Sequence, residues 1–195
     1  TFDDCQSIVK QAFGDAQLRA LNLSAINSIN WARVLAQSVY YVAAALKLGK
    51  TPSFAVPTGN FGNVYAAYVA QKMGAPVGPL VIGSNRNDIL TRFFATGAMT
   101  LESVTPSLSP SMDIQISSNF ERYLFDLLGR DPAQIAALMA EFKAKGRYAV
   151  APEALIRAQN QISAYRCDDA TTLATIKDVY LQSGVLLDPH TAVGY

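Results

Sequence analysis

The sequence predicts an α/β protein built on a doubly wound parallel sheet. Short apolar runs alternate with longer segments whose apolar residues recur at helical spacing. A glycine-bearing turn, Gly-Asn-Phe-Gly at 59–62, joins the first of these runs directly to the helical segment that follows it. Between residues 31 and 94 the order is helix, strand, helix, strand, helix, which is typical of parallel α/β units.

Capping residues and helix-ending glycines set the expected bounds of the elements. Asn30 or Ser28 can cap a long helix that Gly49 ends, and Asp131 caps another helix whose first residue is Pro132. We expect strands over 54–56, 80–82 and 164–167, and helices over 3–16, 31–48, 119–128, 132–145 and 169–184, with further helices ending at 74 and 94 and one beginning at 188.

The predicted organisation of the chain changes along its length. Residues 1–97 form an α/β unit that holds the glycine turn, 98–163 form a long loop and a mostly helical insertion, and 164–195 return to the α/β domain. The loop over 100–118 is longer than is usual inside a compact domain, which suits a functional loop or a substrate lid. The last helix is cut in its first turn, so we expect the domain to be truncated at its C-terminus.

Composition excludes several classes of partner. The chain has 195 residues, of which 16% are charged, and a formal net charge of +1, so nothing favours nucleic acid or an anionic membrane. No apolar run approaches the ~18 residues of a membrane span. Two cysteines make no disulfide framework, which favours the cytoplasm, and with a single histidine they give no zinc site.

The glycine turn predicts an anion site. A turn that leads into a helix presents backbone N–H groups without intrahelical partners, and the helix dipole adds positive potential. The spacing of Gly59 and Gly62 is neither the dinucleotide fingerprint nor a Walker A loop, while Thr58, Asn60 and Asn63 add neutral side-chain donors. This combination suits a permanently held phosphate. On local pattern alone, a turn that binds nothing explains these residues equally well.

A set of motifs spaced over nearly the whole chain resembles threonine synthase of the type found in fungi and many bacteria. They occur in the order found in that family: FDDCQ (2–6), NSINWAR (27–33), PTGNFGN (57–63), SNRND (84–88), SPSMDI (109–114), SSNFER (117–122) and DPHTAVG (188–194). The resemblance implies the tryptophan-synthase-β-like fold and pyridoxal phosphate as cofactor. It also implies conversion of O-phosphohomoserine and water to threonine and phosphate, by elimination and water addition.

The resemblance assigns roles to residues of this chain. It makes Thr58, Gly59, Asn60, Phe61, Gly62 and Asn63 the site of the cofactor phosphate, with Phe61 more suited to pinning the turn than to touching the ligand. The family's Schiff-base lysine is expected upstream of Thr1, so no catalytic residue is assigned here. The isolated chain is then expected to be inactive, with the missing N- and C-terminal parts of the enzyme as its partners.

Other polar residues are weaker candidates. Asn27, Ser28, Asn30 and Arg33 suit the phosphate or carboxylate of the substrate, and helix capping explains them about as well. Turn and cap chemistry likewise explains the remaining candidates, which are Arg86, Asn87, Asp88, Ser111, Met112, Asp113 and the only histidine, His190.

Rival functions remain open at this stage. One is a non-catalytic α/β module that binds a phosphorylated ligand through the glycine turn. Another is a different pyridoxal phosphate-dependent lyase of the same fold.

Overall fold

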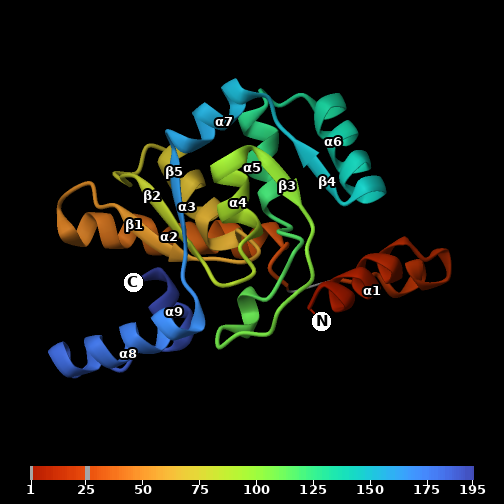
Figure 1. Cartoon of the computed structure of the whole chain (residues 1–195). Helices are drawn as coiled ribbons and strands as arrows, with labels where there is room; N and C mark the ends of the chain where they lie inside the picture. Colours follow the sequence, from red (N-terminus) through yellow and green to blue (C-terminus); the bar gives the residue numbers. More distant parts are fainter. Residues whose placement is uncertain (1, 25–26) are drawn as a thin grey trace.

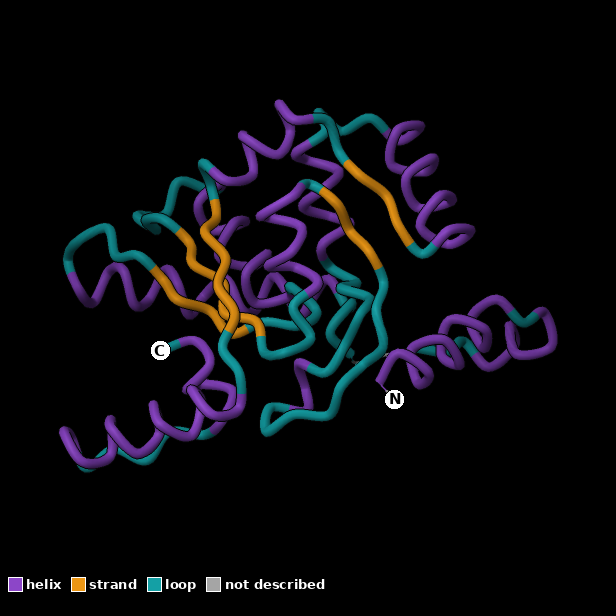
Figure 2. The backbone as a smooth tube through the Cα atoms, viewed as in Figure 1, coloured by secondary structure: helices purple, strands orange, loops and turns teal. Residues whose placement is uncertain are grey.

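The computed structural model describes residues 2–24 and 27–195. Its core is a parallel sheet packed against a group of helices, with α1 and α8 projecting from the body (Figures 1 and 2). The elements in chain order are α1 (Phe2–Gly14), η1 (Ala16–Leu21), α2 (Trp31–Leu48), β1 (Phe54–Pro57), α3 (Gly62–Lys72), β2 (Leu80–Ser84), α4 (Ile89–Thr96), β3 (Ala98–Thr100), η2 (Pro110–Met112), α5 (Phe120–Leu127), α6 (Pro132–Lys145), β4 (Arg147–Ala149), α7 (Pro152–Gln159), β5 (Ile162–Arg166), α8 (Asp169–Ser183) and α9 (Pro189–Gly194).

The main sheet has the order β1-β2-β5, and both pairs are parallel. Phe54 is in register with Leu80, which is in register with Ile162. The parallel pairing of the first two strands confirms the expectation from the helix–strand alternation. Because successive strands are added in one direction through right-handed crossovers, their connecting helices collect on the same face of the sheet.

The two faces of this sheet differ in burial. Val56 and Ile82 point to the face covered by α3 and α4 and belong to the main hydrophobic core. Ala55 and Ser163, at the alternate positions, are exposed, and Tyr165 is 65% exposed. Only one face of the sheet is therefore buried by helices over most of its length. The exception is the carboxyl end, where α9 packs against β1 and β2.

The longest helices begin and end at the predicted caps. Asn30 accepts a hydrogen bond from the Ala32 amide at 2.9 Å at the start of α2, and Gly49 ends that helix with a φ of 61°. Asp131 accepts bonds from the amides of Ala133 and Gln134 at the start of α6. These caps supply acceptors and conformations that a helix end otherwise lacks.

Asp88 differs from its expected role as a helix cap. It occupies the N-cap position of α4, but its side chain makes no capping hydrogen bond. Its carboxylate pairs instead with Arg92 at 2.9 Å and with Arg166 at 3.3 Å. The second pair ties the end of β5 to the start of α4, because these parallel strands end at the same edge of the sheet.

Two strands and an α-helix were not predicted from the sequence, nor were the short helices η1 and η2. Strands β3 and β4 pair antiparallel with Met99 opposite Tyr148, and α7 follows them. Each of these strands has three residues, which is too short for an alternating pattern to be read. Pro152 at the first position of α7 was a usable start signal.

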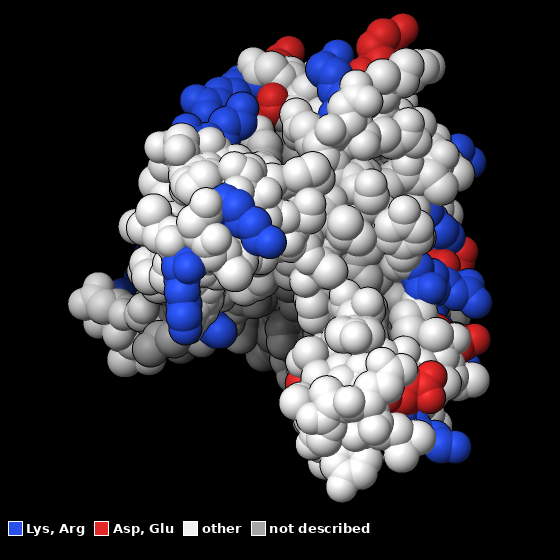
Figure 3. Space-filling view, turned by 90° about the vertical axis from the view of Figure 1, so that its left-hand side faces the viewer, with Lys and Arg blue, Asp and Glu red and all other residues white. Residues whose placement is uncertain are grey.

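The side of the molecule that carries β1, α2 and α8 has few charged side chains (Figure 3). Large apolar side chains are exposed on both of these helices, among them Val39 and Tyr40 of α2 and Leu173 and Leu181 of α8. Even so, no helix in the described ranges combines the length and the hydropathy needed to cross a bilayer.

Candidate anion-binding site

The glycine turn lies at the carboxyl end of β1 and leads directly into α3. Phe61 holds the N-cap position with a φ of 60° and gives the helix no side-chain cap. The hydroxyl of Thr58 accepts a hydrogen bond from the Phe61 amide at 3.1 Å, which closes the turn. The first turn of α3 therefore keeps its N-terminal amides available.

These amides have no hydrogen-bond partner among the described residues. In the part of the chain that the structure describes, the backbone N–H groups of Gly59, Asn60, Gly62 and Asn63 have no hydrogen-bond acceptor. Buried or half-buried amides are nearly always paired, so a row of unpaired ones at a helix N-terminus indicates a place for an anion.

The same residues line a cavity of about 550 Å³. Its walls come from four parts of the chain: the turn itself, the segment before and within α2, the loop around η2, and the start of α9. The lining residues are Asn27, Ser28, Arg33, Gln37, Pro57, Thr58, Gly59, Asn60, Phe61, Gly62, Asn63, Ser111, Met112 and His190.

Packing around the turn explains its sequence. The ring of Phe61 is fully buried and lies 5.1 Å from Phe120 and 5.6 Å from Tyr123, centroid to centroid. This packing holds a non-glycine residue in the left-handed region, which costs free energy by itself. Phe61 thus faces the cavity with its backbone, and its ring anchors the turn.

The two glycines serve close approach, since neither of them has a positive φ. A Cβ on Gly59 would lie 3.0 Å from the Cα of Met112, and one on Gly62 would lie 3.2 Å from Nδ2 of Asn119. The left-handed conformation in this turn is adopted by Phe61 instead.

The side chain of Asn63 points away from the anion position. Its Oδ1 accepts a hydrogen bond from the hydroxyl of Tyr41, and its Nδ2 donates to Gln37 at 3.1 Å. Burial raises the pKa of Tyr41, so its hydroxyl stays protonated and donates. Asn63 is therefore anchored to α2 and offers only its backbone amide, contrary to the expectation of a side-chain donor.

Of the four residues predicted to bind the substrate, three lie at the same cavity. Asn27, Ser28 and Arg33 line it, whereas Asn30 does not and caps α2 instead. The hydroxyl oxygen of Ser28 is buried and has no hydrogen-bond partner among the described residues. Arg33 is exposed and forms no ion pair with any described residue. This wall can therefore offer a hydroxyl and a guanidinium to a second anionic group.

The loop around η2 is fixed by a buried polar network. The carboxylate of Asp113 accepts hydrogen bonds from Asn85 at 2.8 Å, from Asn87 at 2.9 Å and from the backbone and hydroxyl of Ser107. Asn87 also exchanges bonds with the backbone of Thr105. The network holds Ser111 and Met112 against the glycine turn, so these predicted candidates shape the cavity through their backbone placement.

His190 joins α9 to this loop. Its Nε2 accepts a hydrogen bond from the Ser111 amide at 3.3 Å, and its Nδ1 lies 3.2 Å from the carboxylate of Asp188. An accepting Nε2 places the ring proton on Nδ1, facing Asp188. Both ring nitrogens are thus engaged in holding the cavity wall.

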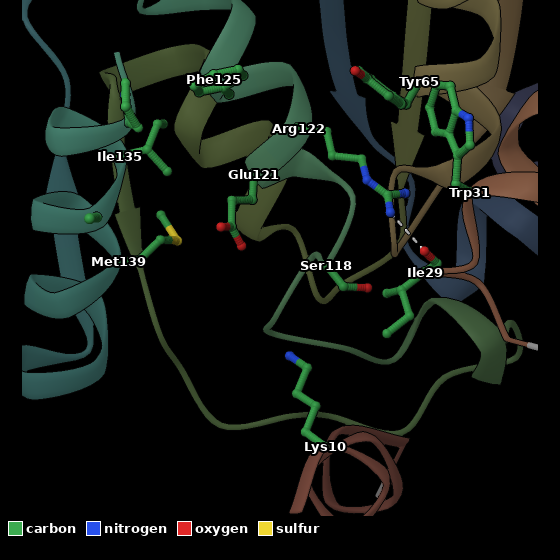
Figure 4. Close-up of a pocket in the computed structure, with 12 residues that line it drawn as sticks. Lys10, Ile29, Trp31, Tyr65, Ser118, Glu121, Arg122, Phe125, Ile135 and Met139 are labelled. Atoms are coloured by element: carbon green, nitrogen blue, oxygen red, sulfur yellow. Dashed lines mark hydrogen bonds between the residues drawn. The ribbon is translucent and has the colours of Figure 1, made fainter. Parts of the chain in front are cut away.

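A larger cavity, of about 720 Å³, lies between α1, α5 and α6 (Figure 4). Its lining is mostly apolar, with Lys10, Glu121 and Arg122 as the charged groups. Lys10 is separate from the anion cavity, and no lysine lines that cavity. Within the described ranges, no cluster of histidine, cysteine and acidic residues could hold a metal ion.

Comparison with known proteins identifies relatives along the whole chain. Threonine synthase of Pseudomonas aeruginosa is 50% identical over 197 aligned residues, which cover 99% of this chain and 42% of that protein. The pyridoxal phosphate-bound threonine synthase of Brucella melitensis superposes with a TM-score of 0.93 at 49% identity, over 100% of this chain and 43% of that one. The yeast enzyme gives a TM-score of 0.86 at 41% identity, over 100% and 42%. No protein-family model matches the chain.

The parallel sheet with the glycine turn at its carboxyl edge is the α/β fold of the pyridoxal phosphate-dependent enzymes of fold type II, on one of which the chain superposes over its whole length. Within this class the chain is homologous from end to end to threonine synthase. It spans about 42% of the length of the curated relatives that it matches.

Proposed function

We propose that this chain is the cofactor-phosphate-binding part of a threonine synthase that converts O-phosphohomoserine and water to threonine and phosphate. The observation that carries the proposal is the row of unpartnered amides at the uncapped start of α3. These amides line a cavity in a chain that is 49% identical to a pyridoxal phosphate-bound threonine synthase.

The residues of the turn fit a phosphate group. The amides of Gly59, Asn60, Gly62 and Asn63 would donate to its oxygens, and the positive end of the α3 dipole would favour its charge. When bound, pyridoxal phosphate would supply the electron sink for elimination and water addition. The part of this chain in the reaction is then to hold and orient the cofactor.

The wall formed by Asn27, Ser28 and Arg33 would bind an anionic group of the substrate. The buried, unpartnered hydroxyl of Ser28 can donate one hydrogen bond, and the exposed guanidinium of Arg33 can bind phosphate or carboxylate in a bidentate manner. We therefore place the substrate phosphate or carboxylate on this wall, opposite the cofactor phosphate.

The reactive lysine would come from another part of the enzyme, because no lysine of this chain lines the cavity. The isolated 195-residue chain should then form no threonine from O-phosphohomoserine with added pyridoxal phosphate. The remainder of the enzyme would be its partner. A reducing compartment such as the cytoplasm suits Cys5 and Cys167, which are both free thiols.

The test compares pyridoxal phosphate with pyridoxal, which keeps the aldehyde but lacks the phosphate. In a full-length enzyme that carries this chain, Gly62→Leu should raise the dissociation constant of pyridoxal phosphate by at least about tenfold, since its Cβ lies 3.2 Å from Asn119. The affinity for pyridoxal should change little.

Gly14→Leu is the matched control, because a Cβ at Gly14 meets nothing within 4 Å. It should leave both affinities unchanged. If Gly62→Leu also leaves the affinity for pyridoxal phosphate unchanged, the turn does not bind the cofactor phosphate.

A further inference from the structure

Three consecutive residues, Ser117, Ser118 and Asn119, all bind the glycine turn, although they follow it by about 58 positions in the chain. The Ser117 hydroxyl donates to the Gly59 carbonyl at 2.8 Å, and the Ser118 hydroxyl donates to Oδ1 of Asn60 at 3.1 Å. We call these three residues the Ser-Ser-Asn clamp.

Asn119 makes the strongest connection in the clamp. It is fully buried, and its Nδ2 donates to the Asn60 carbonyl at 3.0 Å and to the Ser28 carbonyl at 2.8 Å. Its backbone amide also donates to the Asn60 carbonyl, at 3.1 Å. One buried amide thus ties the glycine turn to the opposite wall of the cavity.

Arg122 fixes the direction in which the Asn119 amide points. Its guanidinium donates to Oδ1 of Asn119 at 2.6 Å and to the Ile29 carbonyl at 2.8 Å, and it lies 5.7 Å from the ring centroid of Trp31. Figure 4 shows this guanidinium between Trp31 and Ile29, in the neighbouring cavity. Because Oδ1 accepts from Arg122, Nδ2 must face the two carbonyls.

Because the peptide group is planar, these contacts also fix the directions in which amides of the turn point. In a trans peptide the C=O of one residue and the N–H of the next point in opposite directions. Ser117 holds the Gly59 carbonyl, so the Asn60 N–H points away from the clamp. The next peptide is held at both ends, by Asn119 at the Asn60 carbonyl and by Thr58 at the Phe61 amide.

We propose that the Ser-Ser-Asn clamp is a positioning element that presets the amides of the glycine turn for the phosphate of the cofactor. None of its residues needs to touch the ligand. The inference rests on the proposed function. It adds a role for Ser117, Ser118 and Asn119, on which the assignment of the anion site does not depend.

The test uses a full-length enzyme and the ratio of the dissociation constants of pyridoxal and pyridoxal phosphate. A variant that only loosens the fold should weaken both ligands, whereas loss of the preset amides should lower this ratio. Asn119→Asp should lower it at least about tenfold, because it sets an oxygen against two carbonyls, and Ser117→Ala about threefold.

Two controls accompany these variants. Ser117→Thr keeps the hydroxyl and should retain most of the wild-type ratio. Ser38→Ala removes a buried hydroxyl that donates to the Leu35 carbonyl and not to the turn, and should leave the ratio unchanged. If Asn119→Asp fails to fold, Ser117→Ala with its threonine control decides the question.

The outcomes separate this inference from the proposed function. If the wild-type enzyme shows no preference for pyridoxal phosphate over pyridoxal, the anion site itself is wrong. If Gly62→Leu lowers the ratio but Asn119→Asp and Ser117→Ala keep the wild-type value, the anion site stands and the clamp is overturned. A lowered ratio in both clamp variants supports the proposal.

Discussion

Two connections lead from a strand to a helix at the same edge of the sheet, and they use their polar groups in opposite ways. The connection from β1 to α3 leaves the amides of Gly59, Asn60, Gly62 and Asn63 without acceptors in the described ranges. The connection from β2 to α4 instead binds its own chain, because Oδ1 of Asn85 accepts from the Asn87 amide at 2.8 Å.

The side chains show the same contrast. Asn85 and Asn87 are buried and direct their amide groups to Asp113 and to the loop over 105–109. In the glycine turn, Thr58 bonds only the Phe61 amide, and residues remote in sequence bind the carbonyls of Gly59 and Asn60. A connection whose polar groups are paired within the protein stabilises the neighbouring structure. A connection whose amides remain unpaired, because other residues hold its conformation, can bind a ligand. Position at the strand ends does not by itself distinguish the two.

Among the substitutions that test this contrast, Gly59→Val should have the largest effect, because it alters the connection from β1 to α3. Its Cβ would lie 3.0 Å from the Cα of Met112 and 3.1 Å from the Ile114 side chain, so the loop around η2 must move off the turn. We expect the full-length enzyme to lose pyridoxal phosphate affinity by about 100-fold, a value that equilibrium dialysis measures. Gly14→Val, at an open position, should have no such effect.

Asp113→Ala tests the connection from β2 to α4, whose polar groups are paired within the protein. Removal of the carboxylate leaves buried donors of Asn85 and Asn87 without that acceptor, at a cost of about 2–3 kcal/mol in local opening. Hydrogen exchange of the Ser107 amide, which donates to Asp113 at 2.9 Å, should then become about 30- to 150-fold faster.

Asp131→Ala is the control for that experiment, because it removes a carboxylate that caps α6 away from this network. Exchange at Ser107 should be unaffected by it. Unchanged exchange in Asp113→Ala would show that the loop is held by other contacts.

Tyr41→Phe gives a smaller effect on the open connection. The Tyr41 hydroxyl is a donor to Asn63, and its loss frees the first turn of α3 from α2. We expect about a three- to fivefold weaker affinity for pyridoxal phosphate, as for one lost neutral hydrogen bond. Tyr148→Phe, which removes the hydroxyl of a buried tyrosine outside the lining of the anion cavity, should leave this affinity unchanged. Equal effects of both variants would mean that Tyr41 acts only through general stability.

The smallest effect should come from protonation of the Asp188 carboxylate, at the start of α9. The hydrogen bond from the Thr191 hydroxyl, together with bonds from the amides of Thr191 and His190, lowers its pKa from the usual 3.8. A lowered folded-state pKa means that the carboxylate stabilises α9 above about pH 4 and loses this effect as pH falls through the folded value.

Because α9 packs against both β1 and β2, acidification should loosen both connections to a similar extent. Amide exchange in α9 as a function of pH measures this, and Asp188→Asn should remove the dependence. A pH dependence that persists in Asp188→Asn would assign it to another group.

Much of the fold could be predicted because its signals are local. The bounds of α2 and α6 agree with the predicted ones, since Asn30 with Gly49, and Asp131 with Pro132, act through neighbouring backbone groups. The parallel pairing of β1 and β2 followed from the alternation of strands and helices. The pairing of β3 with β4 could not be predicted, because three-residue strands depend on tertiary contacts.

The site was predicted only in part, for the same reason. The glycine turn is a local motif, and its place between a strand and a helix is readable. The left-handed conformation of Phe61 had no local signal, because the aromatic packing that holds it comes from Phe120 and Tyr123 in α5. The role of Asn119 had no local signal, since it stands before α5 without capping it.

The sequence by itself determined where α2 and α6 begin and end, that β1 and β2 lie parallel, and that a glycine turn precedes a helix. Caps, turn residues and hydrophobic periodicity act over a few residues, so they are written locally in the chain. Only the tertiary structure decided which of two similar connections stays open. That choice depends on hydrogen bonds from Ser117, Ser118 and Asn119, about 58 residues further along, which form only when the chain has packed.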